Sequence, residues 1–220
     1  MTLIVLGIGA RIAYIPVERF RNRTISGLRD PIQVDLDGTD GKTIEGDGYR
    51  VDLRYLAEYD IIGMVVKARR YDRFKKDAPT AWDKATPVDF GIVYGYAAEH
   101  RDALKFEGGP RALNFGLKSE DYARTVEWGR LTSSITNNHI MTEDKAMRKK
   151  LDKVREGEVV RIKGYLVEGE AYDTKVGNGY AETFRSSLTR TDMISNRLAA
   201  KTTCEIIYIT DLEIIEKAPY

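Results

Sequence analysis

The side chains best suited to covalent chemistry in this sequence are its single cysteine, Cys204, and one of its two histidines, His139. A thiolate nucleophile needs a base within hydrogen-bond reach and a third group that holds the base in orientation. Asn138 and Asp192 are the candidates for that third group. Cys204 and His139 fall near predicted strand ends, so their side chains can meet. The alternative interpretation is structural: Cys204 is a small hydrophobe in a buried strand, and His139 satisfies backbone groups before a helix.

A second candidate site is the basic and aromatic segment 67–76. Stacking on aromatic side chains contributes about 1–3 kcal/mol per base, and cations contact the phosphates, so this pattern is typical of a surface for single-stranded nucleic acid. The formal net charge of +1 instead favours a solvated loop, because nucleic-acid-binding domains are usually basic. The candidate residues are Lys67, Arg69, Arg70, Tyr71, Arg73 and Phe74.

A third candidate is an anion site at 185–192, where Arg185 and Arg190 flank serines and threonines. Arginine forms bidentate hydrogen bonds to phosphate or carboxylate, which gives this combination its chemistry. The segment lacks a glycine-rich phosphate cradle, so the alternative is a polar strand whose arginines pair with neighbouring carboxylates.

The sequence offers few ligands for a metal ion. A single cysteine excludes a multi-cysteine zinc or iron–sulfur site, and His100 and His139 do not have the spacing of a helical ligand pair. The acidic segment 35–48 contains aspartates and glycines, but Gly46 stands where a calcium-binding EF-hand loop needs a glutamate. We therefore expect an acidic turn at 35–48, no metal site and no cofactor.

The composition indicates a soluble globular domain. The 220 residues include 35 Lys and Arg against 34 Asp and Glu, and 42% are hydrophobic. Balanced charge excludes a disordered acidic chain and a histone-like polycation, and a chain of this length buries a substantial core without disulfides. The 13 tyrosines, 6 phenylalanines and 2 tryptophans favour a β-rich fold.

The N-terminal residues 1–17 are largely apolar and are followed by several arginines. A bilayer-spanning helix needs about 20 apolar residues, and Arg11 interrupts this run. Two hypotheses remain: the end of a membrane anchor, or a first strand or short helix of the fold. We interpret 1–30 as an apolar and basic extension or anchor remnant, and 31–220 as a single OB-like β domain.

Hydrophobic patterning over the rest of the chain predicts several strands, one helix and then more strands. Met147, Leu151 and Val154 form one apolar stripe of a helix that begins with Thr142 as its N-cap. Gly63 and Gly164 lie inside two predicted strands and indicate bends where backbones approach closely. The predicted strands span 49–55, 59–68, 88–96, 158–168, 180–189 and 203–216, with a loop at 107–127 and an extended segment at 128–135.

This order favours a mainly β fold with minor α content, an OB-like curved β-barrel with one helix between strands and an N-terminal extension. Another small β-barrel or an α+β sandwich fits the same order of elements. No internal repeat or change in composition marks a second domain.

Several stretches resemble a group of uncharacterised bacterial proteins, often N-terminally membrane-anchored, with an OB-like β domain. The likeness covers about residues 50–215, and where the relatives carry a short glycine-containing turn this chain has residues 193–203. The resemblance implies an anchored, envelope-facing β domain and no particular activity. The matching stretches are TNNHIM at 136–141, VREGEVVRIKGYLV at 154–167, RSSLTRTD at 185–192 and CEIIYI at 204–209.

The leading hypothesis from sequence is a non-enzymatic binding or assembly module that engages a protein partner or larger assembly. Membrane association would use residues 1–17, at the membrane or in the cell envelope, with a cytoplasmic location left open. The alternatives are a single-stranded nucleic-acid-binding protein that uses 67–76, and a Cys–His hydrolase.

Overall fold

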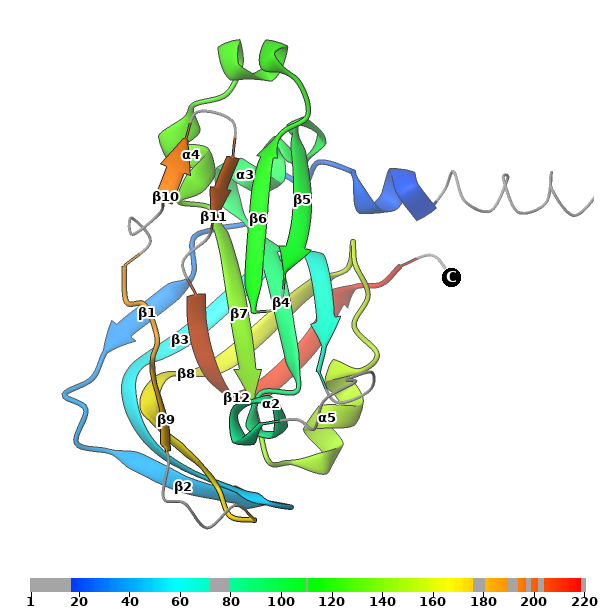
Figure 1. Cartoon of the computed structure of the whole chain (residues 1–220). Helices are drawn as coiled ribbons and strands as arrows, with labels where there is room; N and C mark the ends of the chain where they lie inside the picture. Colours follow the sequence, from blue (N-terminus) through cyan, green and yellow to red (C-terminus); the bar gives the residue numbers. More distant parts are fainter. Residues whose placement is uncertain are drawn as a thin grey trace, which may run out of the picture.

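The computed structural model describes residues 17–71, 80–109, 111–175, 181–189, 194–196, 199–201 and 204–218. In this part of the chain, strands dominate and form two sheets, with short helices at their edges (Figure 1). The prediction of a mainly β protein is therefore confirmed. The apolar residues 1–16 lie outside the described residues.

The larger sheet has eight strands among the described residues, in the order β1-β3-β4-β7-β12-β8-β9, with β2 paired to β3. A further pairing joins β3 to β8, so the ladder that runs from β3 through β4, β7, β12 and β8 returns to β3. The β7–β12 pair is parallel, and the other pairs in this sequence of neighbours are antiparallel. The strands are β1 (Ile32–Asp35), β2 (Gly41–Gly46), β3 (Tyr49–Arg70), β4 (Val88–Val93), β7 (Ile135–Met141), β8 (Val159–Asp173), β9 (Ala181–Arg185) and β12 (Cys204–Glu216).

The two longest strands, β3 with 22 residues and β8 with 15, pair with each other and contain Gly63 and Gly164. A Cβ atom at Gly63 would lie 2.4 Å from Cγ2 of Ile92, and one at Gly164 would lie 2.2 Å from the carbonyl oxygen of Tyr208. Only glycine permits such close approach of neighbouring strands. Both strands extend further than the sequence predicted.

The smaller sheet has the order β10-β11-β6-β5. In this region two predictions from sequence were wrong. The segment 107–127, predicted as a loop, contributes most of a hairpin, and 128–135, predicted as extended, begins with a helix. Leu113, Phe115 and Leu117 alternate into a buried face, a period of two residues that the adjacent glycines obscured. The elements are β5 (Leu104–Gly109), β6 (Ala112–Leu117), β10 (Ile194–Asn196), β11 (Ala199–Lys201), α3 (Gly95–Glu99), η1 (Arg101–Ala103), η2 (Glu120–Arg124) and α4 (Trp128–Thr132).

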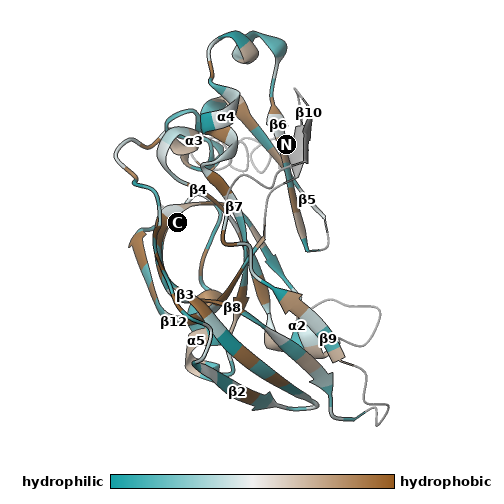
Figure 2. Ribbon diagram, turned by 90° about the vertical axis from the view of Figure 1, so that its left-hand side faces the viewer, coloured by the Kyte–Doolittle hydropathy of each residue, from teal (hydrophilic) through white to brown (hydrophobic). Residues whose placement is uncertain are grey.

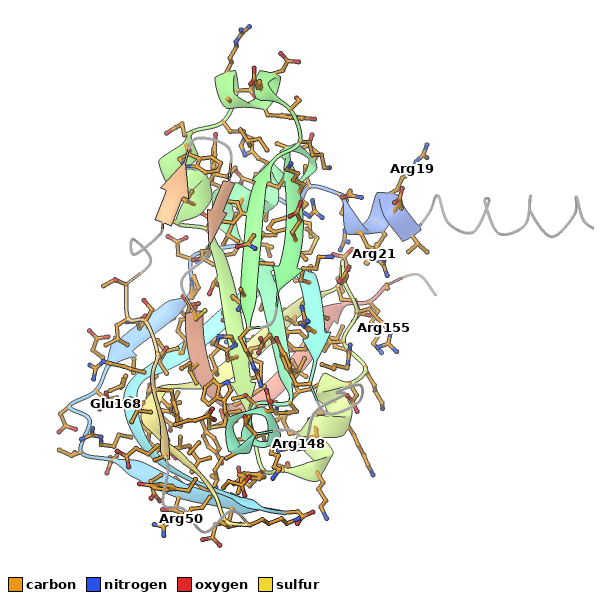
Figure 3. The ribbon with its side chains drawn as sticks, viewed as in Figure 1. Arg19, Arg21, Arg50, Arg148, Arg155 and Glu168 are labelled. Atoms are coloured by element: carbon orange, nitrogen blue, oxygen red, sulfur yellow. The ribbon has the colours of Figure 1, made fainter. Side chains whose placement is uncertain are left out.

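The predicted helix is α5 (Lys145–Leu151), which follows β7 and precedes β8. Its N-cap is Asp144, whose Oδ1 accepts a hydrogen bond from Ala146 N at 2.7 Å. The predicted cap, Thr142, lies two residues before Asp144 and accepts from Asp144 N instead. Arg148 of α5 donates to the carbonyl oxygen of Lys84 at 2.6 Å and so links α5 to the short helix α2 (Ala81–Ala85) (Figure 3).

Three clusters of buried apolar residues form the core. The first contains Ile61, Phe90 and Ile140 from three neighbouring strands together with Leu151 of α5. The second lies against the small sheet, and the third joins β2, β3 and β8 to α2. Hydrophobic and hydrophilic residues alternate along the strands of the large sheet, as expected when each strand face has a different environment (Figure 2).

The segment before β1 contacts α3 and the turn that precedes β8. Residues 17–21 form a helical turn, blue in Figure 1, and Arg23 donates to the carbonyl oxygen of Gly157 at 2.6 Å. The N–H of Ile25 donates to the carbonyl oxygen of Ala98 at 3.0 Å. Among the described residues, no helix combines the length and apolar character needed to cross a bilayer.

Candidate functional site

The neighbouring strands β4, β7 and β12 bring Asp89, His139 and Cys204 to one face of the large sheet. Asp89 is directly opposite His139 in the β4–β7 pair, and Cys204 is opposite Asn137 in the β7–β12 pair. Because side chains two residues apart share a strand face, Asn137 and His139 project on the same side. The strand register therefore places a carboxylate, an imidazole and a thiol side by side.

The side-chain contacts run in the same order, from Asp89 to His139 to Cys204. Nδ1 of His139 lies 2.8 Å from Oδ1 of Asp89, and the two side chains are only 6% and 5% exposed. The imidazole also lies close enough to the half-buried Cys204 for each group to shift the pKa of the other, and Nδ2 of Asn137 donates to Sγ of Cys204 at 3.8 Å. The ring of Trp82 meets His139 edge to face, with 6.1 Å between ring centroids.

The protonation of the two central groups shifts in opposite directions. Burial lowers the pKa of His139, but hydrogen bonds and charge interactions with Asp89 and Cys204 outweigh burial and raise it to about 9. Burial raises the pKa of Cys204, but the hydrogen bond and positive charge of His139, with a smaller effect of Asn137, bring it below the usual thiol value. Both pKa shifts act toward a thiolate beside an imidazolium, the reactive state of a nucleophilic cysteine.

Asp89 is itself held by two further side chains. The hydroxyl of Tyr71 donates to Oδ2 of Asp89 at 2.7 Å, and Nη1 of Arg111 donates to Oδ1 at 2.7 Å. Nη2 of Arg111 continues to Oδ1 of Asp83 at 2.9 Å and to the carbonyl oxygen of Thr86 at 3.0 Å. Burial and the charge of Asp89 raise the pKa of Tyr71, which keeps its hydroxyl a donor. The carboxylate that faces His139 is therefore fixed in place.

Arg111 lies at the turn between β5 and β6 and has a φ of 52°, a left-handed conformation that is costly for a residue with a side chain. Its N–H donates to the hydroxyl of Tyr71 at 2.8 Å, and its guanidinium lies 3.6 Å from the centre of the Tyr71 ring. These contacts, together with those to Asp83 and Asp89, hold the hairpin turn against the end of β3 and the start of β4. Backbone strain is thus offset at the edge of the candidate site.

A cavity of about 240 Å³ lies beside this cluster, between β3, β4 and the β5–β6 hairpin. Asp89 and Asn137 form part of its wall, so the cavity reaches the residues that contact His139 and Cys204. Gly91 admits the hairpin, because a Cβ atom there would lie 2.7 Å from Cδ2 of Leu113. Its lining residues are Lys67, Ala68, Arg69, Tyr71, Asp89, Gly91, Gly108, Gly109, Ala112, Leu113, Asn137 and Glu156.

Of the two third residues that the sequence suggested for a cysteine–histidine pair, one does not meet the imidazole and the other is not described. Cys204 and His139 are together, but the group that meets the imidazole is Asp89. Asn138 projects to the other face of β7, where its Nδ2 donates to the carbonyl oxygen of Phe90 at 3.1 Å. Asp192 lies outside the described residues.

Three of the predicted nucleic-acid residues, Lys67, Arg69 and Arg70, belong to the end of β3 rather than to a loop, and Tyr71 follows directly. Lys67 lies 3.8 Å from Glu156, and Arg69 donates to the carbonyl oxygen of Gly108 at 3.3 Å. Arg70 donates to three carbonyl oxygens at the end of α5, between residues 151 and 154. Arg73 and Phe74 lie outside the described residues.

The predicted anion site at 185–192 contributes to the position of Cys204. Arg185 forms an ion pair with Glu168 of β8, labelled in Figure 3, and Arg190 lies outside the described residues. Ser186 Oγ accepts from the N–H of Ile206 at 3.0 Å, and the N–H of Ser187 donates to the carbonyl oxygen of Cys204 at 3.1 Å. These serines therefore hold the first residues of β12.

Sequence reasoning missed Asp89, Arg111 and the hydroxyl of Tyr71 as parts of the site. Asp89 left a signal, because it is a carboxylate inside the apolar run of β4, and a buried carboxylate is almost always paired. Arg111 left none, since its contacts join segments distant in sequence.

No protein-family model matches the chain, and comparisons with curated proteins and with solved structures find no significant match.

Proposed function

We propose that this protein is a cysteine-dependent hydrolase of acyl compounds, with Cys204 as nucleophile, His139 as general acid and base, and Asp89 as the group that orients His139. The observation that carries the proposal is the contiguous Asp89–His139–Cys204 cluster, in which the pKa of the thiol is lowered and that of the imidazole is raised. A nucleophile, a base in contact with it and a third group behind the base are the elements that acyl transfer requires.

The reaction would run as two acyl transfers. The Cys204 thiolate adds to the substrate carbonyl, the bond to the leaving group breaks, and the imidazolium of His139 gives its proton to that group. Neutral His139 then takes a proton from water, and the resulting hydroxide adds to the thioester. The carbon–sulfur bond breaks, which releases the acid and restores the thiolate beside the imidazolium.

A purely structural role explains only part of the cluster. The contacts among Asp83, Asp89, Tyr71 and Arg111 fix the hairpin turn against the large sheet. These contacts do not involve the thiol of Cys204. A structural role for them therefore does not explain why the pKa of Cys204 is lowered beside a buried histidine.

The proposed fold also fits this arrangement. We propose that β3, β4, β7, β8 and β12 form an OB-like barrel, supported by their cyclic pairing, the parallel β7–β12 pair and the position of α5 between β7 and β8 in sequence. Asp89, His139 and Cys204 would then lie on the outer surface of the barrel, on the side covered by the β5–β6 hairpin.

Acylation by an activated ester tests the proposal. We expect p-nitrophenyl acetate to release nitrophenolate and to leave one acetyl group on the protein, detected by intact mass and mapped to Cys204. Cys204→Ser is the control, and because the chain has a single cysteine no other thiol can give this result. A wild-type protein that is folded but neither releases nitrophenolate faster than Cys204→Ser nor gains an acetyl group on Cys204 would contradict the proposal.

A second candidate function is the protein-binding module, and one observation favours it. Ile32 and Val34 on the edge strand β1 are 64% and 52% exposed, and β1 pairs with β3 at one end of the order of strands. An exposed apolar edge strand is a surface on which a partner can add a further strand. The test is to recover this protein together with its partner by mild detergent extraction. We expect Val34→Lys to abolish that complex. Ile215→Lys, at another exposed apolar residue that is 49% accessible, is the matched control.

A further inference from the structure

Asn137 connects the thiol to the cavity. It lies on β7 opposite Cys204, its side chain is buried, and its Nδ2 donates to Sγ at 3.8 Å. The same residue forms part of the wall of the cavity of about 240 Å³ beneath the β5–β6 hairpin. A group that enters this cavity therefore meets Asn137, the lining residue whose amide contacts the sulfur of Cys204.

The neighbouring asparagine cannot take this role. Asn138 is fully buried on the opposite face of β7 and donates to the carbonyl oxygen of Phe90. The strand alternation thus directs one amide into the core and the other toward Cys204. Of the two adjacent asparagines, only Asn137 faces the proposed reaction.

We propose that the Nδ2 amide of Asn137 is the oxyanion donor of this site and that the substrate carbonyl reaches Cys204 from the cavity between β4 and the β5–β6 hairpin. This inference rests on the proposed hydrolase function and names a further catalytic residue for it. When sulfur adds to the carbonyl carbon, the electron pair of the C=O bond moves to oxygen. On collapse the pair returns, the bond to the leaving group breaks, and His139 supplies the proton for that group.

The distance suits this role. An amide within 3.8 Å of the attacking sulfur can reach an oxygen bonded to the carbon that the sulfur attacks. A donor aimed at that oxygen is most effective where water is excluded, and burial of Asn137 and His139 provides that condition.

The cavity also narrows the class of substrate. Gly108, Gly109, Ala112 and Leu113 supply a wall of small and apolar groups from the hairpin. A cavity of about 240 Å³ is below the usual range for drug-sized ligands. The site is therefore suited to a small acyl group rather than to a long lipid chain.

Two reactions of the same thiol separate this role from a structural one. Iodoacetamide alkylates sulfur by displacement at a saturated carbon and forms no oxyanion, whereas p-nitrophenyl acetate acylates it through one. We expect Asn137→Ala to lower the acylation rate about 10²–10³-fold and to change the alkylation rate by a much smaller factor, with both rates expressed per thiolate. Asn114→Ala, at an exposed asparagine on β6, is the matched control and should alter neither rate.

The possible outcomes are distinct. Unchanged acylation of Asn137→Ala, with the wild type acylated normally, overturns the role of Asn137 and leaves the proposed hydrolase intact. Equal loss of acylation and alkylation also overturns it, because Asn137 would then only hold Cys204 in place. A wild-type protein that neither forms an acetyl thioester nor releases nitrophenolate faster than Cys204→Ser contradicts the hydrolase function itself, and the inference with it.

Discussion

Two polar clusters contact β12, and they differ in how deeply their side chains are buried and in the pKa of the central group. Near its start, Cys204 meets His139 and Asp89, both of which are less than a tenth exposed. Further along, Tyr208 meets Lys42 and Glu143, whose side chains are 42% and 28% exposed. Each cluster joins an acidic hydrogen donor to a cation and a carboxylate, so the residue types alone do not distinguish them.

The protonation of the two central groups separates these clusters. The pKa of Cys204 is lowered, because the imidazolium of His139 outweighs the effect of burial. Burial raises the pKa of Tyr208, and Glu143 adds to the rise although Lys42 opposes it, so the hydroxyl stays protonated. An activated nucleophile therefore needs a buried cation that is itself held by a carboxylate, as His139 is by Asp89.

The largest expected effect tests that difference through catalysis. We expect His139→Gln to lower the hydrolysis of p-nitrophenyl acetate about 10²–10⁴-fold, because the general acid and base is lost. Tyr208→Phe removes the corresponding group of the exposed cluster and should leave the rate unchanged. Steady-state release of nitrophenolate checks both variants, and equal losses in the two would remove the distinction between the clusters.

The second effect is on stability. Asp89→Asn leaves His139 without its buried counter-charge and removes one of the two buried carboxylates that pair with Arg111, and breaking a buried pair costs about 3–5 kcal/mol. Glu143→Gln breaks a more exposed pair, for which about 0.2–1 kcal/mol is expected. The free energy of unfolding in urea measures both values, and similar costs for the two variants would contradict the contrast in burial.

The third effect is a pH dependence whose sign follows from His139. Its pKa is about 9 in the folded protein against an ordinary value of 6.5, so its contribution to stability is fully present below about pH 6.5 and is lost as pH rises through 9. We expect the wild type to lose more stability than His139→Gln between pH 6.5 and pH 10. Parallel unfolding curves of the two proteins across this range would show that His139 does not carry a raised pKa.

The sequence indicated the general fold because its signals are local. The apolar stripe of Met147 and Leu151 identified α5, and Gly63 and Gly164 marked the places where strands approach closely. The β5–β6 hairpin was missed, because Gly108 and Gly109 have the chemistry of a loop although they end β5.

The candidate site was predictable only in part for a similar reason. Cys204 and His139 stand out by residue type, whereas the choice of Asp89 depends on the β4–β7 register, which no local pattern specifies. Strand alternation could have excluded Asn138, since adjacent residues of a strand face opposite sides. Arg111 depends on a turn conformation that its own side chain disfavours.

The most direct test of the central claim is the pH dependence of Cys204 alkylation by iodoacetamide in the folded protein. We predict a rate that rises with an apparent thiol pKa below the ordinary value of about 8.5, and an increase of that pKa in His139→Gln. An apparent pKa at or above the ordinary value, or one that the His139 substitution does not change, would contradict the presence of an activated thiolate.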